Sequence, residues 1–210
     1  MMAHTTMQFV AELQDYKPRI WRRFQISSNA DLADFCYALM EMFHMGGHLF
    51  DFNIKGERYV LPLPAGLDDW DGPVKNVKGV VISKLFTKEG DSGEMWYDFG
   101  DSWYVKVKLE TLNVSEIISA DELPRVIKGK GFGIIENCGG VWGLEEIAEG
   151  LRTGKGEDWE DRKSWLEEIC PEVLEKGMDF CDIDEINAAI KAGYVASIYK
   201  KMAKQRKNYQ

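Results

Sequence analysis

The chain contains little histidine and no closely paired cysteines, and both shortages limit the metal chemistry it can support. Its histidines are His4, His44 and His48, and its four cysteines are scattered along 210 residues. Because no Cys-x-x-Cys pair occurs, a zinc knuckle and a thioredoxin-like motif are excluded by spacing. We therefore expect reduced thiols that lie partly in the core, and we predict no cofactor and no tightly bound transition metal.

Long apolar runs are also missing from the sequence. No stretch of about 18 consecutive apolar residues occurs, so we expect neither a membrane span nor a membrane partner. The chain begins Met-Met-Ala-His-Thr-Thr, which does not combine a basic segment with an apolar one. This absence predicts that there is no secretory signal and that the protein is cytoplasmic.

Two glycine-containing motifs resemble nucleotide sites but lack the residues that such sites need. Asp98-Phe99-Gly100 matches the magnesium-binding tripeptide of kinases, yet the chain has no Gly-rich loop after a strand, no Val-Ala-Ile-Lys element and no His-Arg-Asp loop. The segment Gly129–Gly133 lacks the Gly-x-x-x-x-Gly-Lys-Ser/Thr order of a P-loop. We reject both interpretations and expect residues 129–133 to form a flexible connection.

Acidic residues are absent from the last part of the chain, which makes the charge uneven. The net charge is −9, made up of −4 over residues 1–135, −11 over 136–185 and +6 over 186–210. An acidic body repels a phosphate backbone, so nucleic-acid binding is expected only through the tail. A solvated helix end or an acidic partner are the alternatives for the tail cations. These cations are Lys200, Lys201, Lys204, Arg206 and Lys207.

The hydrophobic period changes near residue 135, and this change predicts the fold class. Before it, apolar residues mostly alternate, which is typical of strands. A helical stripe from Leu32 to Phe43, opened by a capping-box-like sequence from Ser28 to Asp31, interrupts the strands. The predicted strands are Thr6–Leu13, Ile20–Ile26, His48–Lys55, Arg58–Leu61 and the two arms of the hairpin at residues 94–110.

After residue 135 the pattern is that of helices. We predict them at Val141–Leu151, Trp159–Ile169, Pro171–Glu175 and Ile183–Ala192. Strands followed by helices indicate an α+β fold, with a largely antiparallel, roll-like sheet from residues 6–111 and helices mainly from the C-terminal part. We expect residues 1–192 to form a single α+β domain and residues 193–210 to form a basic C-terminal helix or tail.

The turn within the predicted hairpin at residues 94–110 is the most informative local feature of the sequence. Asp98 and Asp101 flank Phe99-Gly100, and Trp103 opens the second strand arm with its side chain predicted to face inward. Gly100 permits positive φ, and either aspartate can accept hydrogen bonds from the local backbone, so the pair could stabilise a tight turn. The alternative is that the two carboxylates accept hydrogen bonds from a cation and form part of a site.

Two arginines are the candidate cations. Strand alternation places Arg22 and Arg23 on opposite faces, so one guanidinium must point toward apolar neighbours and needs compensation. A carboxylate offers it in two-pronged geometry. We predict that Arg22 or Arg23 makes a charge-assisted hydrogen bond to Asp98, Asp101 or Glu136.

Histidine and glycine spacing adds two weaker signals. His44 and His48 are four residues apart, a metal-ligand spacing on a helix, but Gly46-Gly47 lies between them and ordinary structural histidines are the alternative. Glu136 precedes a predicted helix, and Gly139-Gly140 suggests a close approach of backbone. The candidate binding or structural polar cluster is Arg22, Arg23, His48, Asp98, Asp101, Trp103 and Glu136, with no metal assigned.

Several motifs, taken in order, resemble the family of the third open reading frame of the agropine-type Ri plasmid, whose members are also described as passenger proteins of an insertion element. The resemblance covers roughly residues 5–190 and implies an α+β, roll-like domain of unknown biochemical function. The motifs are Pro18-x-Ile-Trp-Arg-Arg23, His48-Leu-x-x-Phe52, Tyr97-Asp-Phe-Gly-Asp-x-Trp103, Glu136-x-x-Gly-Gly140 with Gly143, and Phe180-x-Asp182-x-x-x-x-Asn187.

The chain departs from the family pattern at positions that bear on catalysis. The resemblance implies Leu-His where Phe35-Cys36 stands, histidine where Val105 stands, and Pro-Pro-Glu-Asp where Ile134–Asn137 stands. Our leading hypothesis is therefore a non-catalytic interaction or accessory domain, linked to mobile elements by the resemblance, with an unknown protein partner. The alternatives are a hydrolase, degenerate or metal-dependent, that uses Asp98, Asp101, His48 and Glu136, and an accessory nucleic-acid binder that uses the tail.

Overall fold

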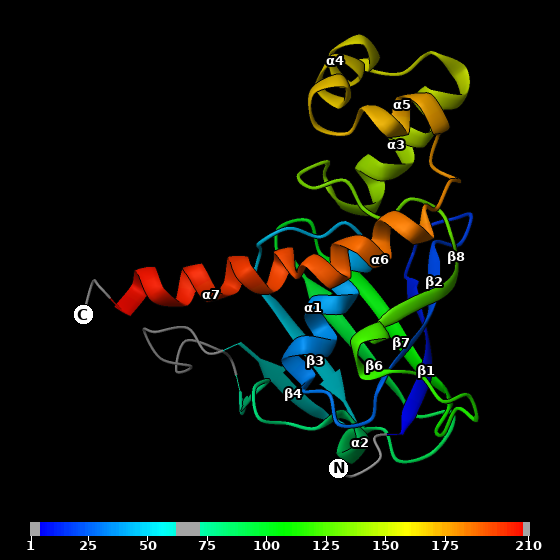
Figure 1. The fold of residues 1–210 in the computed structure, drawn as a ribbon. Coiled ribbons are helices and arrows are strands. Elements are labelled where there is room, and N and C mark those ends of the chain that lie inside the picture. Colours follow the sequence, from blue (N-terminus) through cyan, green and yellow to red (C-terminus); the bar gives the residue numbers. More distant parts are fainter. Residues whose placement is uncertain (1–4, 62–71, 208–210) are drawn as a thin grey trace.

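The computed structural model describes residues 5–61 and 72–207, with side chains described as far as residue 202. At its centre is a sheet with the strand order β5-β4-β3-β6-β7-β1-β2-β8 (Figure 1). Neighbouring strands are antiparallel except for β4 and β5. The strands are β1 (Thr6–Leu13), β2 (Trp21–Ser27), β3 (Phe50–Ile54), β4 (Glu57–Val60), β5 (Lys75–Asn76), β6 (Ser92–Tyr97), β7 (Trp103–Thr111) and β8 (Arg125–Lys130).

The hairpin of β6 and β7 forms as its alternation predicts. Trp103, Val105, Val107 and Leu109 are fully buried on one face of β7, while the residues between them are more exposed. Tyr97 pairs with Trp103 at the closed end of the hairpin and with Phe50 of β3 on the other side. These two pairings fix the position of the turn that follows Tyr97.

The helices cover the sheet and extend beyond it. Helix α1 lies against the sheet, and α6 and α7 pack against α1 (Figure 1). A separate helical unit, α3 to α5, stands at one end of the sheet. The helices are α1 (Leu32–Met42), α2 (Ile82–Leu85), α3 (Gly140–Thr153), α4 (Trp159–Ile169), α5 (Pro171–Lys176), α6 (Ile183–Ala192) and α7 (Tyr194–Lys207), with a short 3-10 helix at Ala120–Glu122. The α+β class and the mostly antiparallel sheet are confirmed.

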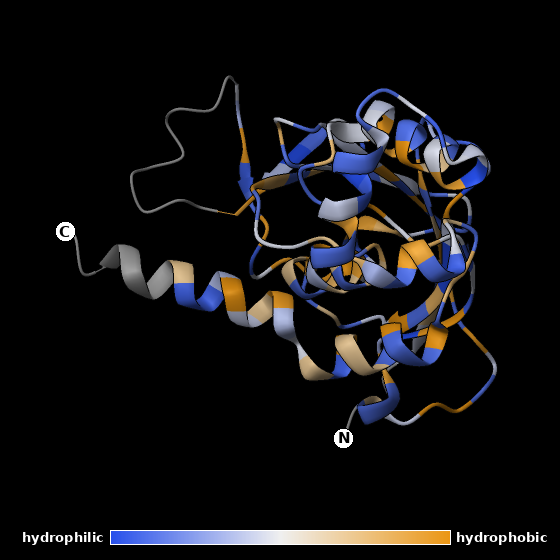
Figure 2. Ribbon diagram, turned by 90° about the horizontal axis from the view of Figure 1, so that it is seen from above, coloured by the Kyte–Doolittle hydropathy of each residue, from blue (hydrophilic) through white to orange (hydrophobic). Residues whose placement is uncertain are grey.

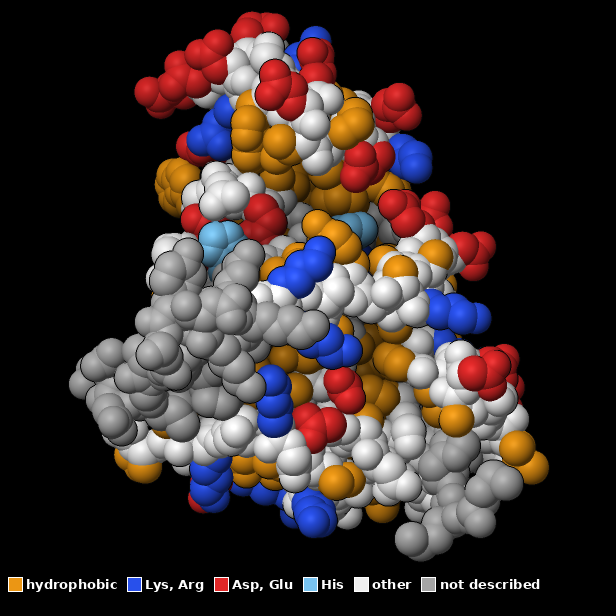
Figure 3. Space-filling view, turned by 60° about the vertical axis from the view of Figure 1, so that its left-hand side comes forward, with side chains coloured by type: hydrophobic (Ala, Val, Ile, Leu, Met, Phe, Trp, Pro, Cys, Tyr) orange, Lys and Arg blue, Asp and Glu red, His pale blue; other side chains and the backbone are white. Residues whose placement is uncertain are grey.

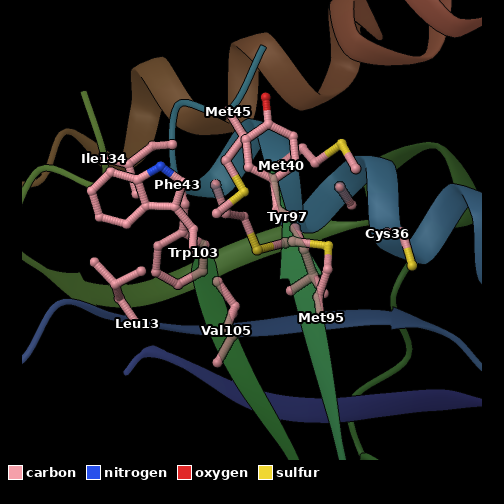
Figure 4. Close-up of a cluster of buried hydrophobic side chains, with 14 of the residues drawn as sticks. Leu13, Cys36, Met40, Phe43, Met45, Met95, Tyr97, Trp103, Val105 and Ile134 are labelled. Atoms are coloured by element: carbon pink, nitrogen blue, oxygen red, sulfur yellow. The ribbon is translucent and has the colours of Figure 1, made fainter. Parts of the chain in front are cut away.

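A dense apolar core fills the space between α1 and the sheet. Figure 4 shows Cys36 and Met40 of α1 facing Met95 of β6 and Val105 of β7. Cys36 and Val105 are fully buried in this core. The two positions at which the family resemblance implies histidine are therefore core positions of this chain.

Two local expectations need correction. Helix α1 begins at Leu32, and Asp31 rather than a Ser28 capping box caps it, with its side chain accepting from Ala33 N at 2.9 Å. The expected flexible connection at residues 129–133 is wrong for its first part, because Gly129 and Lys130 belong to β8 and pair with β2. Phe132 then donates its backbone N–H to Met178, which holds the rest of the segment.

Three of the four cysteines lie in the core. Cys36, Cys138 and Cys170 are buried as free thiols, and burial raises the pKa of each. Within residues 5–61 and 72–207, no helix combines the length and apolar character needed to cross a bilayer. The tail forms helix α7, which runs away from α3–α5 in Figure 1 and projects from the body toward the C-terminal end in Figure 2.

Candidate functional site

Three of the predicted polar residues meet at one end of the sheet. His48 lies between α1 and β3, Asp98 follows β6, and Glu136 lies between β8 and α3. One ligand atom from each lies within 4.8 Å of those from the other two, and all three residues are half-buried. Figure 3 shows histidine with acidic neighbours at the boundary between the upper helical unit and the body. We call this group the His48–Asp98–Glu136 cluster.

The Glu136 carboxylate is oriented by two donors on one of its oxygens. Oε1 accepts the Tyr97 hydroxyl at 2.5 Å and a short hydrogen bond from the Gly46 N–H. Oε2 is buried, has no hydrogen-bond partner in the described part of the chain, and lies 3.5 Å from His48 Nε2. The carboxylate thus presents one satisfied and one unsatisfied oxygen.

Tyr97 is the residue that positions Glu136. Its side chain is fully buried, and its hydroxyl also accepts the backbone N–H of His48 at 3.3 Å. Burial raises the pKa of the Tyr97 phenol far above its usual range, and the hydrogen bond to Glu136 raises it further. The phenol therefore keeps its proton and remains a donor to Glu136.

Asp98 serves both the turn and the cluster. Its φ is 51°, and its Oδ1 accepts the Gly100 N–H at 3.1 Å, as the turn-stabilising interpretation predicts. The same oxygen lies 3.7 Å from His48 Nδ1. The Asp98 carboxylate can therefore stabilise the turn and contribute to the cluster at the same time.

Asp101 has a separate task. Its Oδ2 accepts the Gly139 N–H at 3.3 Å, and a Cβ added to Gly140 would lie only 2.4 Å from the Asp101 carbonyl oxygen. Gly140 also has a φ of 70°. The predicted close approach of backbone at the paired glycines is confirmed. Asp101 and Gly140 together tie the β6–β7 turn to the start of α3.

Trp103, which was predicted to belong to the polar cluster, lies in the core instead. Its side chain is fully buried and packs in the core beside Tyr97 (Figure 4). Its indole nitrogen has no hydrogen-bond partner among the described residues. Trp103 pairs with Tyr97 across the hairpin, so its connection to the cluster runs through Tyr97.

The predicted arginine–carboxylate pair at this site is wrong. Arg22 is fully buried, but its guanidinium donates to backbone carbonyls. Arg23, on the opposite face, pairs with Glu110 of β7 at 2.6 Å. The acceptors of Arg22 are the carbonyl oxygens of Met42, Trp21 and Lys130, at 2.9–3.0 Å, and of Phe132 through a short bond.

Backbone carbonyls from three segments thus accept hydrogen bonds from the Arg22 guanidinium, which was predicted to pair with a carboxylate. Arg22 joins the end of α1 to the chain that leads from β8 to Glu136, so it supports the site at a distance. Burial lowers the pKa of Arg22 to about 10, which still leaves the side chain charged at neutral pH.

Sequence reasoning missed three contributors to the site, and it left one histidine open. Tyr97, Gly46 and Tyr199, whose hydroxyl donates to the His48 carbonyl, gave no separate signal because their roles depend on tertiary contacts. His44 lies elsewhere: it has a φ of 58° and stacks on Phe132 with ring centroids 4.2 Å apart. The four-residue spacing of His44 and His48 therefore reflects no shared helix face.

Comparisons with known proteins place the chain among uncharacterised relatives. The family model for plasmid pRiA4b ORF-3-like protein matches residues 5–184. The uncharacterized protein y4hQ of Sinorhizobium fredii is 24% identical over 166 residues, which cover 78% of this chain and 82% of that protein. The crystal structure of a protein of unknown function, MM3350 from Methanosarcina mazei Go1, superposes with a TM-score of 0.70 at 26% identity, and covers 87% of this chain and 96% of that one.

Proposed function

We propose that this chain, which belongs to the plasmid pRiA4b ORF-3-like protein family of unknown function, is a non-catalytic binding domain. The domain takes a divalent cation at the His48–Asp98–Glu136 cluster. The observation that carries the proposal is the unsatisfied Oε2 of Glu136, buried and turned toward the imidazole. A buried acceptor without a donor is costly, and a cation would compensate it.

The spacing of the cluster favours a bridging ion over direct hydrogen bonds. His48 Nε2 lies 3.5 Å from Glu136 Oε2, and His48 Nδ1 lies 3.7 Å from Asp98 Oδ1, both longer than an ordinary N–H···O bond of about 2.7–3.2 Å. One imidazole nitrogen would bind the ion, and a single ligand atom from each of the three side chains lies within 4.8 Å of the other two. The His48 side chain is 41% exposed, so it has room to adjust toward a shared ion. The three segments that supply the ligands are held by Tyr97, Gly100 and Asp101 contacts before any ion arrives.

The donor set defines the class of cation. Two carboxylates and one imidazole suit ions that accept both oxygen and nitrogen, and Mn²⁺ is the natural probe. Three protein groups are available among the described residues and the site is partly exposed, so water would complete the coordination and the ion would exchange readily. This form of binding agrees with the sequence-based prediction that no tightly bound transition metal is present.

Hydrolysis is the second candidate function, and the same cluster favours it. A metal held by His48, Asp98 and Glu136 could activate water. The fourth residue of that hypothesis, Asp101, is engaged by the Gly139 N–H, which is why binding without catalysis is our first choice.

We further propose a cytoplasmic setting, supported by the buried free thiols, and a protein partner, since the acidic body disfavours nucleic acid.

Calorimetric titration of the full chain with MnCl₂ tests the proposal. His48→Asn, Asp98→Asn and Glu136→Gln should each weaken Mn²⁺ binding at least tenfold. Asp101→Asn is the matched control, because it removes the same charge from the same turn, removes no ligand, and leaves an amide oxygen that can still accept the Gly139 N–H. Its affinity should stay within threefold of wild type.

Two outcomes would overturn the proposal. Wild-type protein that binds no Mn²⁺ would remove the site, and an Asp101→Asn variant that loses as much affinity as Asp98→Asn would reduce it to general acidic attraction. Mn²⁺-dependent cleavage of bis-p-nitrophenyl phosphate that disappears in Glu136→Gln would replace binding with the hydrolase function.

A further inference from the structure

The helical unit α3–α5 carries a pocket that is both aromatic and acidic. The pocket encloses about 270 Å³, between α3 and the first turn of α4. Trp142 forms part of its wall and is 73% exposed, whereas Trp159 is buried at its base. Figure 3 shows acidic side chains gathered over this end of the molecule. The charged lining residues are Glu145, Glu146, Glu149, Glu157, Lys155 and Arg162.

Two of these glutamates have no cationic partner. Glu146 pairs with Arg162, and Glu149 pairs with Arg152. Glu145 and Glu157 are exposed and form no ion pair within the described part of the chain. An exposed tryptophan beside unpaired carboxylates is suited to a lysine or arginine side chain, which gains ion pairing and contact with the ring face together.

The same chain carries a matching cationic segment. Residues 186–210 contain six basic and no acidic residues. The first half of α7 is anchored: Tyr199 is buried and Val195 N donates to Glu41 at 2.7 Å. Beyond it, Lys200 and Lys201 are exposed, and the helix continues to Lys207.

The arrangement of the two segments makes the contact intermolecular. Helix α7 runs away from the α3–α5 unit in Figure 1, so a chain presents its cationic helix to a neighbour and not to its own pocket. We propose that the Trp142 pocket docks the basic α7 helix of a second copy of this chain. The inference goes beyond cation binding at His48 and does not depend on it.

Sedimentation velocity of the full chain at several concentrations tests the inference. At low salt, wild type should associate beyond its 24.0 kDa monomer, and the association should weaken at about 0.5 M NaCl, where screening shortens the range of attraction. Glu145→Lys with Glu157→Lys, and separately Lys201→Glu with Lys204→Glu, should each abolish it. An equimolar mixture of these two variants should associate again, because one retains the tail and the other retains the pocket.

A charge-matched control separates the pocket from overall acidity. Glu167→Lys with Glu168→Lys makes the same charge change on exposed positions of α4 outside the pocket, and it should associate like wild type. A wild type that is monomeric at every concentration and salt would overturn the inference. So would a control variant that loses association, or a mixture that stays monomeric.

Discussion

At the scale of single residues, Arg22 shows how a buried charge can be stabilised without a counter-ion. Its guanidinium has five N–H donors in a fixed fork, and four of them are donated to backbone carbonyls. Gly129 makes room for it, because a Cβ there would lie 2.9 Å from Arg22 Cδ. Through these hydrogen bonds the arginine links α1, β2 and the chain that leads to Glu136.

Removing the Arg22 side chain should lower the stability of the folded chain. Arg22→Ala leaves several buried carbonyls without donors, and we expect it to lower the free energy of unfolding by about 3–5 kcal/mol. Arg23→Ala, in a pair that is about a third exposed, should cost about 0–1 kcal/mol. Urea denaturation of both variants provides the measurement, and similar losses in the two would contradict the account.

His44 should make stability depend on pH in mildly acidic solution. Burial, and then the nearby Arg22, lowers the pKa of His44 to about 4, below the value of about 6.5 for an unfolded histidine. Between these values the unfolded chain binds more protons, so this contribution to stability falls as the pH drops from about 6.5 to 4.

The variant His44→Asn isolates this term, because asparagine tolerates the positive φ of the position. Measured by urea denaturation, the advantage of wild type over His44→Asn should shrink by up to about 1.4 kcal/mol for each pH unit across that window. Parallel stability curves for the two proteins would show that His44 does not titrate in this way.

Tyr97→Phe tests how far Glu136 depends on its outer partner. The change removes the hydroxyl that donates to Oε1 and leaves the ring in the core. Outer-shell partners of metal ligands typically contribute about 10–100-fold to affinity. We expect Mn²⁺ affinity in the calorimetric titration to fall within that range, and an unchanged affinity would show that Gly46 alone positions the carboxylate.

At the scale of elements, the contact of the β6–β7 turn with the start of α3 sets the geometry of the site. Gly140 and Gly154 have nearly equal φ values of 70° and 67°, but only Gly140 faces another backbone. Gly154→Ala should therefore cost about 1–2 kcal/mol from φ strain alone. Gly140→Ala adds a clash with the Asp101 carbonyl, so it should lower the thermal midpoint further and also weaken Mn²⁺ binding.

The outcome to measure is the difference between these two glycine variants. Thermal unfolding and Mn²⁺ titration of both give it directly. Equal midpoints and equal affinities would mean that the approach of Gly140 to Asp101 does not hold the turn in place.

Elements with a clear hydrophobic period were predictable from the sequence, and elements without one were not. Strand β7 alternates strictly and α1 carries a continuous apolar stripe, so both were identified. In β8, Val126 alone is buried, and the strand exists because it pairs with β2. That dependence on a distant partner leaves no local signal.

The candidate site divides in the same way. His48, Asp98 and Glu136 could be selected from their chemistry and their place beside glycine-rich turns. The partners of Arg22 could not, because backbone carbonyls are present at every position and only the fold decides which ones converge.

At the scale of the whole molecule, the cluster exists only when three distant segments fold together. His48, Asp98 and Glu136 are brought to one end of the sheet by the pairing of β3 with β6 and by the contact of α3 with the turn. A cation that binds only this assembled form must stabilise the folded chain. The fold likewise places the acidic α3–α5 unit and the cationic helix α7 on separate surfaces of the molecule.

One divalent cation is expected to bind among the side chains of His48, Asp98 and Glu136. Anomalous diffraction from crystals soaked in MnCl₂, recorded above and below the manganese absorption edge, locates the ion directly. We predict a single strong anomalous peak within coordination distance of His48, Asp98 and Glu136, and its absence from Glu136→Gln crystals soaked in the same way. Manganese peaks confined to other acidic surfaces, with none at this cluster, would contradict the account.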